Sequence, residues 1–154
     1  MGLDMYLDAR RYVSNFGNDT GLHNKLNELT TSLGYTMEAK EITFRAMYWR
    51  KANQIHKWFV DNVQNGVDDC GHYPVSSDQL QQLLIIVNSL LEEKNAEMAS
   101  SKLPPQSGFF FGNEDINDYY WDDLESTKEG LEKMFAQIGD NYEFDWTVTY
   151  HSSW

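Results

Sequence analysis

Residues 142–150 read YEFDWTVTY, and this stretch decides the fold that the sequence predicts. Apolar and polar side chains alternate along it, so that its even-numbered residues share one face, as in a half-buried β-strand. A lone strand leaves its backbone N–H and C=O groups without partners, so it needs a neighbouring strand. The partly alternating stretch 3–13, LDMYLDARRYV, is the best candidate. The sequence therefore predicts an antiparallel sheet formed by the two ends of the chain.

Between these ends, the first half of the chain has two helical patterns and one ambiguous stretch. Residues 20–33 carry four leucines spaced three and four apart, which indicates an amphipathic helix that Gly34 ends. Residues 36–47 mix strand-favouring and helix-permitting residues, and both states stay open. Residues 48–65 place apolar side chains in one helical stripe with charged ones opposite, which predicts a helix.

The second half of the chain contains two long helical patterns. Ser76 and Gln79 have the spacing of a capping box, and the apolar stripe behind them continues to about residue 99. Residues 100–112 include two adjacent prolines and three glycine-flanked phenylalanines, which predicts a loop. A further helical pattern runs from about residue 115 to 138.

These elements together predict an α+β fold, with a small antiparallel sheet of the N- and C-terminal strands packed with three to four helices. The chain has 154 residues, which is a common size for one domain and enough to bury a core without metal or disulfides. We therefore expect a single domain over residues 1–154.

Charge limits the partners that the protein is expected to have. The net charge is −12, which opposes general binding to nucleic acid and to acidic membrane surfaces. Residues 1–60 hold eight Lys or Arg against six Asp or Glu, whereas the rest holds four against 18. The sequence thus allows a locally positive pocket on an acidic molecule, or an acidic face for a basic partner.

Cysteine content and hydropathy indicate the compartment. The single Cys70 excludes an internal disulfide and fits a reducing environment. No apolar run approaches the ~20 residues that a membrane-spanning helix needs. We expect a cytoplasmic protein with no membrane segment, no metal and no cofactor.

Aromatic and basic residues between positions 48 and 59 suggest a ligand site. Trp58 falls outside the apolar stripe of the predicted helix, beside Lys51 and Gln54, where its ring is free to stack on a base while cations neutralise a phosphate. In the loop 107–112, an extended chain would put Phe109 and Phe111 on one face and Phe110 on the other. The expected contacts of a nucleotide-like ligand are Trp58, Lys51, Gln54, Arg50, Phe110 and His72.

Acidic residues recur at helical spacing in the third long helix. Such a row is typical of a solvated face, but it also resembles the phosphate spacing of a duplex. The alternative function is therefore an acidic, DNA-mimic-like inhibitor of a host nucleic-acid-processing protein. The residues that would present this acidic face are Asp115, Asp118, Asp122, Glu125 and Glu129.

A third possibility is a small hydrolase, in which Cys70, His72, His56 or the clustered acids perform the chemistry. Such a site needs a nucleophile, a base and an anion-stabilising element in one place, and the sequence contains only fragments of these. We therefore predict a binding protein rather than an enzyme.

Several segments carry a resemblance that covers most of the chain. The start MGLDMYL, the stretch YWRKANQIHKWFVDNVQ followed by GVDDCG, the loop SGFFFG and the closing SSW resemble a family of small acidic proteins encoded by bacteriophages and prophages. The resemblance implies expression in the cytoplasm of a bacterial host and brings no catalytic residues with it. By analogy with small phage accessory proteins, it implies an anti-defence or host-takeover role, by sequestering a nucleotide or blocking a host protein.

The expected surface also suggests self-association. Trp154, Trp121 and Tyr119 add aromatic surface beyond what one small sheet and a few helices readily cover. A sheet of few strands leaves an edge with unpaired backbone groups. We therefore expect a homodimer.

Overall fold

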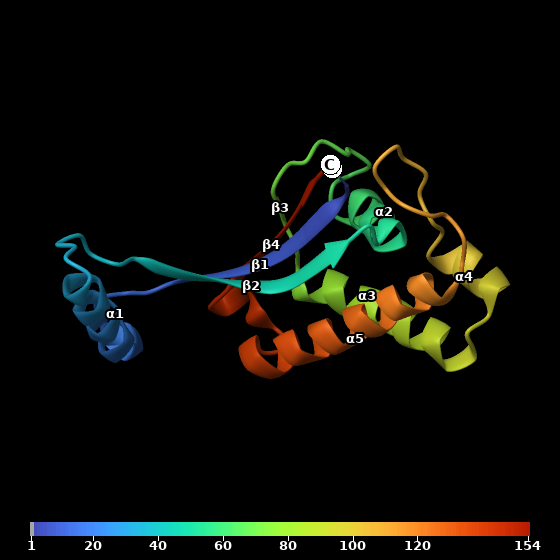
Figure 1. The fold of residues 1–154 in the computed structure, drawn as a ribbon. Helices are drawn as coiled ribbons and strands as arrows, with labels where there is room; N and C mark the ends of the chain where they lie inside the picture. The colour runs from blue at the N-terminus through green and yellow to red at the C-terminus, as the bar shows by residue number, and fades with distance from the viewer. Residues whose placement is uncertain (1) are drawn as a thin grey trace.

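A computed structural model describes residues 2–154, and a four-stranded sheet lies at its centre (Figure 1). The strands are Asp4–Tyr12 (β1), Glu41–Arg50 (β2), Tyr73–Pro74 (β3) and Thr147–Ser153 (β4). They are arranged in the order β2-β1-β4-β3, and every neighbouring pair is antiparallel. The predicted α+β class and the pairing of the two terminal strands are confirmed.

Five α-helices accompany the sheet in residues 2–154, together with two short 3-10 helices. The α-helices are Thr20–Ser32 (α1), Asn53–Asn62 (α2), Ser77–Glu93 (α3), Ala96–Lys102 (α4) and Asp118–Ile138 (α5). The 3-10 helices are Gly17–Asp19 (η1) and Tyr142–Phe144 (η2). Helices α3 and α5 run alongside each other below the sheet in Figure 1, and α2 lies where β2 ends.

The core lies between the inner face of the sheet and these helices. Alternate residues point inward and are buried from Leu3, just before β1, to Ala9 within it. On β2, Trp49 donates a hydrogen bond from Nε1 to Thr127 Oγ1 of α5 at 2.8 Å. Gly130 permits close approach at the next turn of α5, because a Cβ there would lie 2.3 Å from the Met47 Cε atom. Burial of these residues joins sheet and helix into one body.

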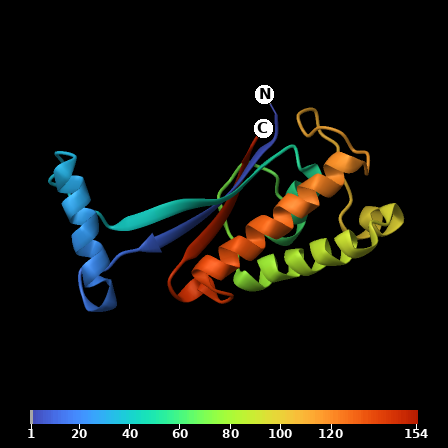
Figure 2. The same ribbon diagram turned by 60° about the horizontal axis from the view of Figure 1, so that its bottom comes forward.

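A second region projects from this body. Strands β1 and β2 continue past the first residue of β4 as a two-stranded ribbon, and α1 lies at its far end, away from the other helices (Figures 1 and 2). We call residues 10–46 the arm. Val13 is the only buried residue within it, and it lies outside the main core cluster.

Two predicted elements differ from the structure because tertiary contacts override the local pattern. Residues 48–50 were expected to be helical but form the end of β2, since pairing with β1 and burial of Trp49 against α5 favour an extended chain. Residues 142–144 were expected to begin a strand but form η2, and Phe144 is 93% exposed rather than on the inner face.

The long helix after Ser76 begins as predicted and ends earlier. The capping box is confirmed, with Ser76 accepting from the backbone N–H of Gln79 and the Gln79 side chain accepting from that of Ser76. Lys94 then adopts a left-handed conformation, with φ of 45°, and ends α3. Asn95 caps the separate helix α4, in which residues 96–99 were expected to continue the long helix and residues 100–102 to begin a loop.

Candidate ligand-binding cavity

A cavity of about 260 Å³ lies where the end of β2, the start of α2, the loop before α5 and the first turns of α5 meet. Its walls are polar and carry charges of both signs. The residues that line it are Arg50, Lys51, Gln54, Gly112, Asn113, Asp115, Asn117, Tyr119, Tyr120 and Asp123.

The cations reach this cavity through an unusual turn after β2. Lys51 has φ of 61°, a left-handed conformation that residues with a Cβ rarely adopt. The turn is held by hydrogen bonds from Lys51 N to Leu3 O and from Asn53 N to Lys51 O, both 2.8 Å. Gly112, in the loop before α5, packs directly against the aliphatic part of the Lys51 side chain, since a Cβ on Gly112 would lie 3.2 Å from Lys51 Cβ. Backbone strain of this kind concentrates at functional sites.

A buried amide holds the opposite wall in place. Asn53 is 2% exposed, and its Nδ2 donates to the carbonyl oxygens of Phe111 at 3.1 Å and Asn113 at 2.9 Å. Its Oδ1 accepts from the backbone N–H of Gln106 at 3.0 Å. One side chain thus ties three points of the loop to α2. The loop is therefore ordered before any ligand arrives.

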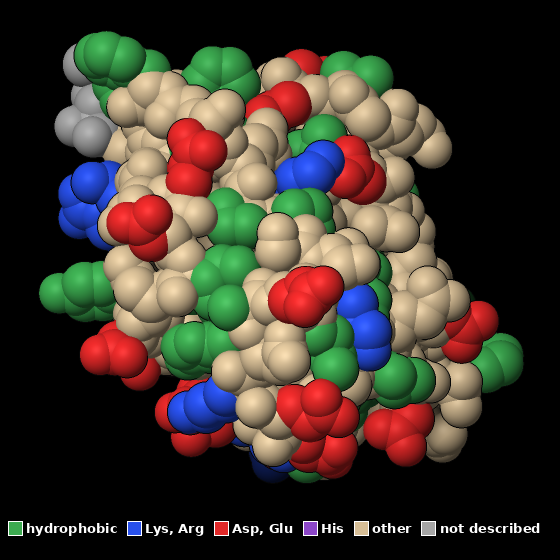
Figure 3. Space-filling view, turned by 90° about the vertical axis from the view of Figure 1, so that its right-hand side faces the viewer, with side chains coloured by type: hydrophobic (Ala, Val, Ile, Leu, Met, Phe, Trp, Pro, Cys, Tyr) green, Lys and Arg blue, Asp and Glu red, His purple; other side chains and the backbone are tan. Residues whose placement is uncertain are grey.

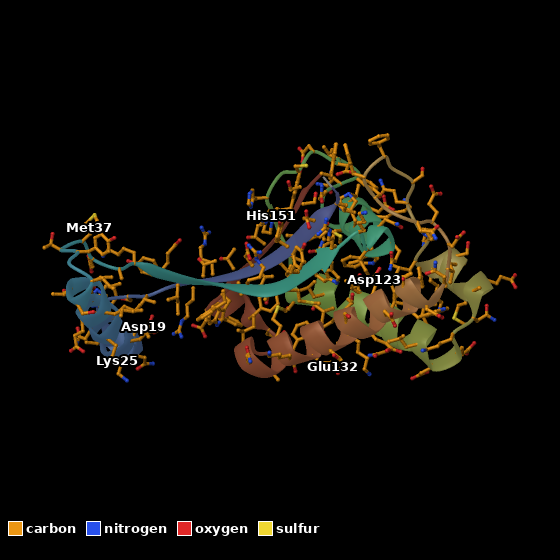
Figure 4. All side chains as sticks on the ribbon, viewed as in Figure 1. Asp19, Lys25, Met37, Asp123, Glu132 and His151 are labelled. Carbon is orange, nitrogen blue, oxygen red and sulfur yellow. The ribbon has the colours of Figure 1, made fainter. Side chains whose placement is uncertain are left out.

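The floor contains a carboxyl group with altered acidity. Asp123 lies on the side of α5 that faces α2 (Figure 4), and its Oδ2 accepts from Gln54 Nε2 at 3.1 Å. Burial raises the pKa of Asp123 to about 6, against a smaller lowering by the Gln54 hydrogen bond. This carboxyl group therefore exchanges its proton close to neutral pH.

The N-terminus of α5 completes the site. Asn117 caps this 21-residue helix, and its Oδ1 accepts from the backbone N–H groups of Tyr119 at 3.0 Å and Tyr120 at 3.4 Å. The partial positive charge of the helix start therefore borders the cavity. Tyr119 is 79% exposed, so its ring is free to stack on a ligand, whereas Tyr120 is buried with its hydroxyl donating to Leu103 O.

Of the residues predicted as ligand contacts, three line this cavity and three do not. Arg50, Lys51 and Gln54 come together there. Trp58 is 5% exposed, so the expectation that its ring is free to stack is wrong. Helix α2 is buried on most of its surface, and the Trp58 ring packs edge-on against Phe59 with centroids 5.2 Å apart.

The two remaining contacts lie elsewhere. Phe110 is half-buried against Phe109, and its backbone oxygen accepts from Leu3 N. The loop is a turn rather than extended, with Phe111 N donating to Gly108 O, so Phe111 is buried and Phe109 exposed instead of sharing a face. His72 stacks on His151 outside the cavity, with ring centroids 4.2 Å apart.

Sequence reasoning missed two residues of the cavity, Tyr119 and Asp123. Asp123 lies on α5 three residues after Tyr120 and four before Thr127, both of which are buried. A carboxylate on the apolar side of a helix is the signal from which Asp123 could have been identified. Tyr119 had no comparable signal, because its role depends on what the loop brings near it.

His56 lies buried between two polar partners. It is fully buried, with Nδ1 2.8 Å from the Tyr150 hydroxyl and Nε2 3.0 Å from Asp68 Oδ2. Both ring nitrogens therefore have partners within the protein. Asp68 also accepts from Trp154 Nε1 at 3.1 Å, which fixes the end of the chain.

The predicted acidic residues are all exposed. Four lie on α5, and Asp115 precedes the helix and borders the cavity instead. Glu125 is paired with Lys94 at 3.0 Å. Acidic side chains are spread over the end of the molecule that carries α4, with hydrophobic side chains between them (Figure 3).

Comparisons with family models, curated proteins and solved structures find no match to this chain. Within residues 2–154, no helix is both long and apolar enough to span a bilayer. The same residues contain no group of three or more His, Cys, Asp or Glu arranged to hold a metal ion. The function therefore has to be argued from the cavity itself.

Proposed function

We propose that the protein is a phage-type accessory protein that sequesters a small nucleotide-like ligand in the cavity between β2, α2 and α5. The observation that carries this proposal is Lys51, whose strained backbone conformation places it beside Arg50 at a cavity that also meets the N-terminus of α5. Two cations and a helix N-terminus together favour an anionic group such as phosphate.

The other walls suit the rest of such a ligand. The exposed ring of Tyr119 offers a surface on which a base stacks. Gln54 and Asp123 offer a donor and an acceptor to the edge of a base, and a protonated Asp123 also donates.

Volume limits the size of the ligand. Typical small-molecule sites have roughly 300–1,000 Å³, and this cavity is slightly smaller at about 260 Å³. A mononucleotide or a smaller phosphorylated compound fits better than a dinucleotide. The groove between α3 and α5 is larger, about 820 Å³, but no Lys or Arg lines it.

Thermal-shift and calorimetric titration of the full chain with linear and cyclic mononucleotides tests the proposal. A ligand at 100 times its Kd adds about 2.7 kcal/mol to the free energy of unfolding. Lys51→Met keeps the stem that packs on Gly112 and removes the charge, so it should abolish the shift. Lys57→Met, a matched change on α2 outside the cavity, should retain it. No shift with any nucleotide, or equal binding by Lys51→Met, overturns the proposal.

The exposed acids of α5 support a second candidate, an inhibitor that presents Asp118, Asp122, Glu125 and Glu129 to a basic cleft of a host protein. Association driven by such charges is fast and sensitive to salt. The test is capture from bacterial lysate at low and high salt, compared with a variant in which all four acids are amides. Capture of the same host protein by both forms excludes this face.

A further inference from the structure

Strand β2 forms one edge of the sheet over its whole length. Its ten residues pair with β1 on one side, and in residues 2–154 no backbone hydrogen bond reaches its other side. An exposed edge of this length is a template for another strand. Natural sheets usually protect such an edge with charges, prolines or an irregularity.

The irregularity in β2 is a bulge at Ala46. Leu7 lies opposite Met47 while Asp8 lies opposite Arg45, so Ala46 is the extra residue. As a result, the side chains that face inward are even-numbered before the bulge and odd-numbered after it. A straight strand added to this edge would have its inward-facing side chains beside those of one half of β2, but beside the outward-facing side chains of the other half.

A second copy of β2 carries the same bulge, and this removes the mismatch. Only one antiparallel register, with a two-fold axis at the bulge, pairs all ten residues with all ten of a second copy. That register puts residue 42 opposite 49 and 44 opposite 47, all of which face inward. It also puts residue 43 opposite 48, both of which face outward, and residue 41 opposite 50, where the two strands end. The bulge therefore favours self-pairing over pairing with an unrelated straight strand.

The side chains in this register are complementary. Glu41 of each copy, whose Oε2 lies 3.9 Å from Arg10 Nε of its own chain, lies opposite Arg50 of the other copy, and Arg50 has no salt bridge within residues 2–154. Phe44, which is 57% exposed, meets Met47, and Ile42 meets Trp49. Arg45 lies near the axis but points to β1, where its Nε donates to Asp8 Oδ1 at 2.5 Å. Opposite charges and apolar pairs across strands stabilise a sheet.

We propose that two copies of the chain pair through their β2 edges in this register and form one continuous eight-stranded sheet. Because the strands are antiparallel, Glu41 of each copy lies beside Arg50 of the other, and residues 13–40 of the arm extend past it toward the candidate cavity. The second copy thereby contributes a carboxylate beside a cation of that cavity. In the dimer, the exposed apolar side chains of each arm pack on the surface of the other copy. The pairing does not require a ligand.

Mass measurement by light scattering and analytical ultracentrifugation gives the first test. We expect twice the 17.9 kDa of one chain at micromolar concentration. Glu41→Arg opposes like charges at both ends of the paired strands and should weaken the dimer about tenfold, since two pairs change by symmetry. Adding Arg50→Glu should restore it, while Glu92→Arg on α3 is the matched control that should leave it unchanged. A mass of one chain throughout overturns the proposal.

A cross-link tests the register. In a Cys70→Ser background, Thr43→Cys together with Tyr48→Cys should give a disulfide-linked dimer under oxidation, because residues 43 and 48 face each other across the two copies. Each single cysteine variant is the control and should not cross-link. A dimer in solution whose double variant does not cross-link has another interface and overturns the inference.

Discussion

The body and the arm differ in what holds them together. In the body, the two central helices and the inner face of the sheet bury leucines, aromatics and methionines in one cluster. In the arm, Val13 is the only buried residue, although the arm contains about a quarter of the chain. Seven of the fourteen exposed large hydrophobic side chains of residues 2–154 lie in the arm. The comparison shows that a local helical pattern and the pairing of two neighbouring strands are enough to specify a helix and a ribbon, even where no hydrophobic core forms around them.

Labelled side chains show the same contrast. In Figure 4, Lys25 and Met37 lie at the far end of the arm, whereas Asp123 lies within the body. The arm is held by polar contacts such as Asn27 Oδ1 accepting from Ala39 N at 3.0 Å and Arg11 paired with Asp19 at 2.7 Å. Such contacts are individually worth little compared with core burial.

A Leu→Ala substitution made once in the body and once in the arm should show the largest difference in the free energy of unfolding. Leu124→Ala in α5 removes a fully buried side chain and should lower the free energy of unfolding by about 2–5 kcal/mol. Leu29→Ala in α1 alters a side chain that is 56% exposed and should change it by less than about 0.5 kcal/mol. Urea unfolding followed by circular dichroism measures both. Equal losses would show that the arm has a core of its own or a permanent partner.

Carboxyl groups in the two regions should respond to pH in opposite ways. The pKa of Glu38 in the arm is lowered, mainly by its hydrogen bond with Lys40, whereas burial raises the pKa of Asp123 in the body to about 6. The stability associated with protonated Asp123 is present below pH ~4 and is lost as pH rises through about 6.

Asp123→Asn should therefore be more stable than the parent at pH 7–8 and similar to it at pH 4. Solvent screening of this partly exposed group limits the expected gain to about 1–2 kcal/mol. Urea unfolding at several pH values measures it. A constant difference between the two proteins across this range would contradict the raised pKa.

The two regions also differ in how their helices begin. Asn117 accepts two backbone hydrogen bonds at the start of α5, so Asn117→Ala should cost about 1 kcal/mol. Helix α1 has no side-chain cap bond at Asp19, which is occupied instead by Arg11 and Ser14. Asp19→Asn should therefore cost less than Asn117→Ala. Thermal unfolding of both variants provides the comparison, and a larger cost in the arm would reverse it.

Removing most of the arm should have the smallest effect on the body. Val13 N donates to Lys40 O at 2.8 Å, so these residues mark a point at which the ribbon can be closed. Replacing residues 14–39 with Asn-Gly, which forms a tight hairpin turn, should change the free energy of unfolding of the body by less than about 1 kcal/mol. Chemical denaturation monitored by tryptophan fluorescence tests this, since all five tryptophans lie outside the deleted segment. Failure of this variant to fold would show that the arm is needed by the body.

The site could be anticipated only in part. Charge asymmetry indicated a positive region on an acidic chain, and Arg50, Lys51 and Gln54 do line one cavity. The helical wheel placed Trp58 outside the core because it assumed a helix from residue 48 and one buried face. The structure surrounds α2 with the loop before α5 and with the sheet, so Trp58 is buried.

What the sequence determined by itself rests on short-range periodicity and local hydrogen bonding. The alternation near the C-terminus predicted β4, the capping box predicted the start of α3, and leucine spacing predicted α1. The tertiary structure alone decided that residues 48–50 extend β2, that Lys51 turns left-handed and that Asp123 is half-buried against Gln54. Each of these depends on partners far away in the chain, in β1, in the loop before α5 or in α2. Local pattern contains no information about such contacts, because the free energy that favours them arises only when distant segments pack together.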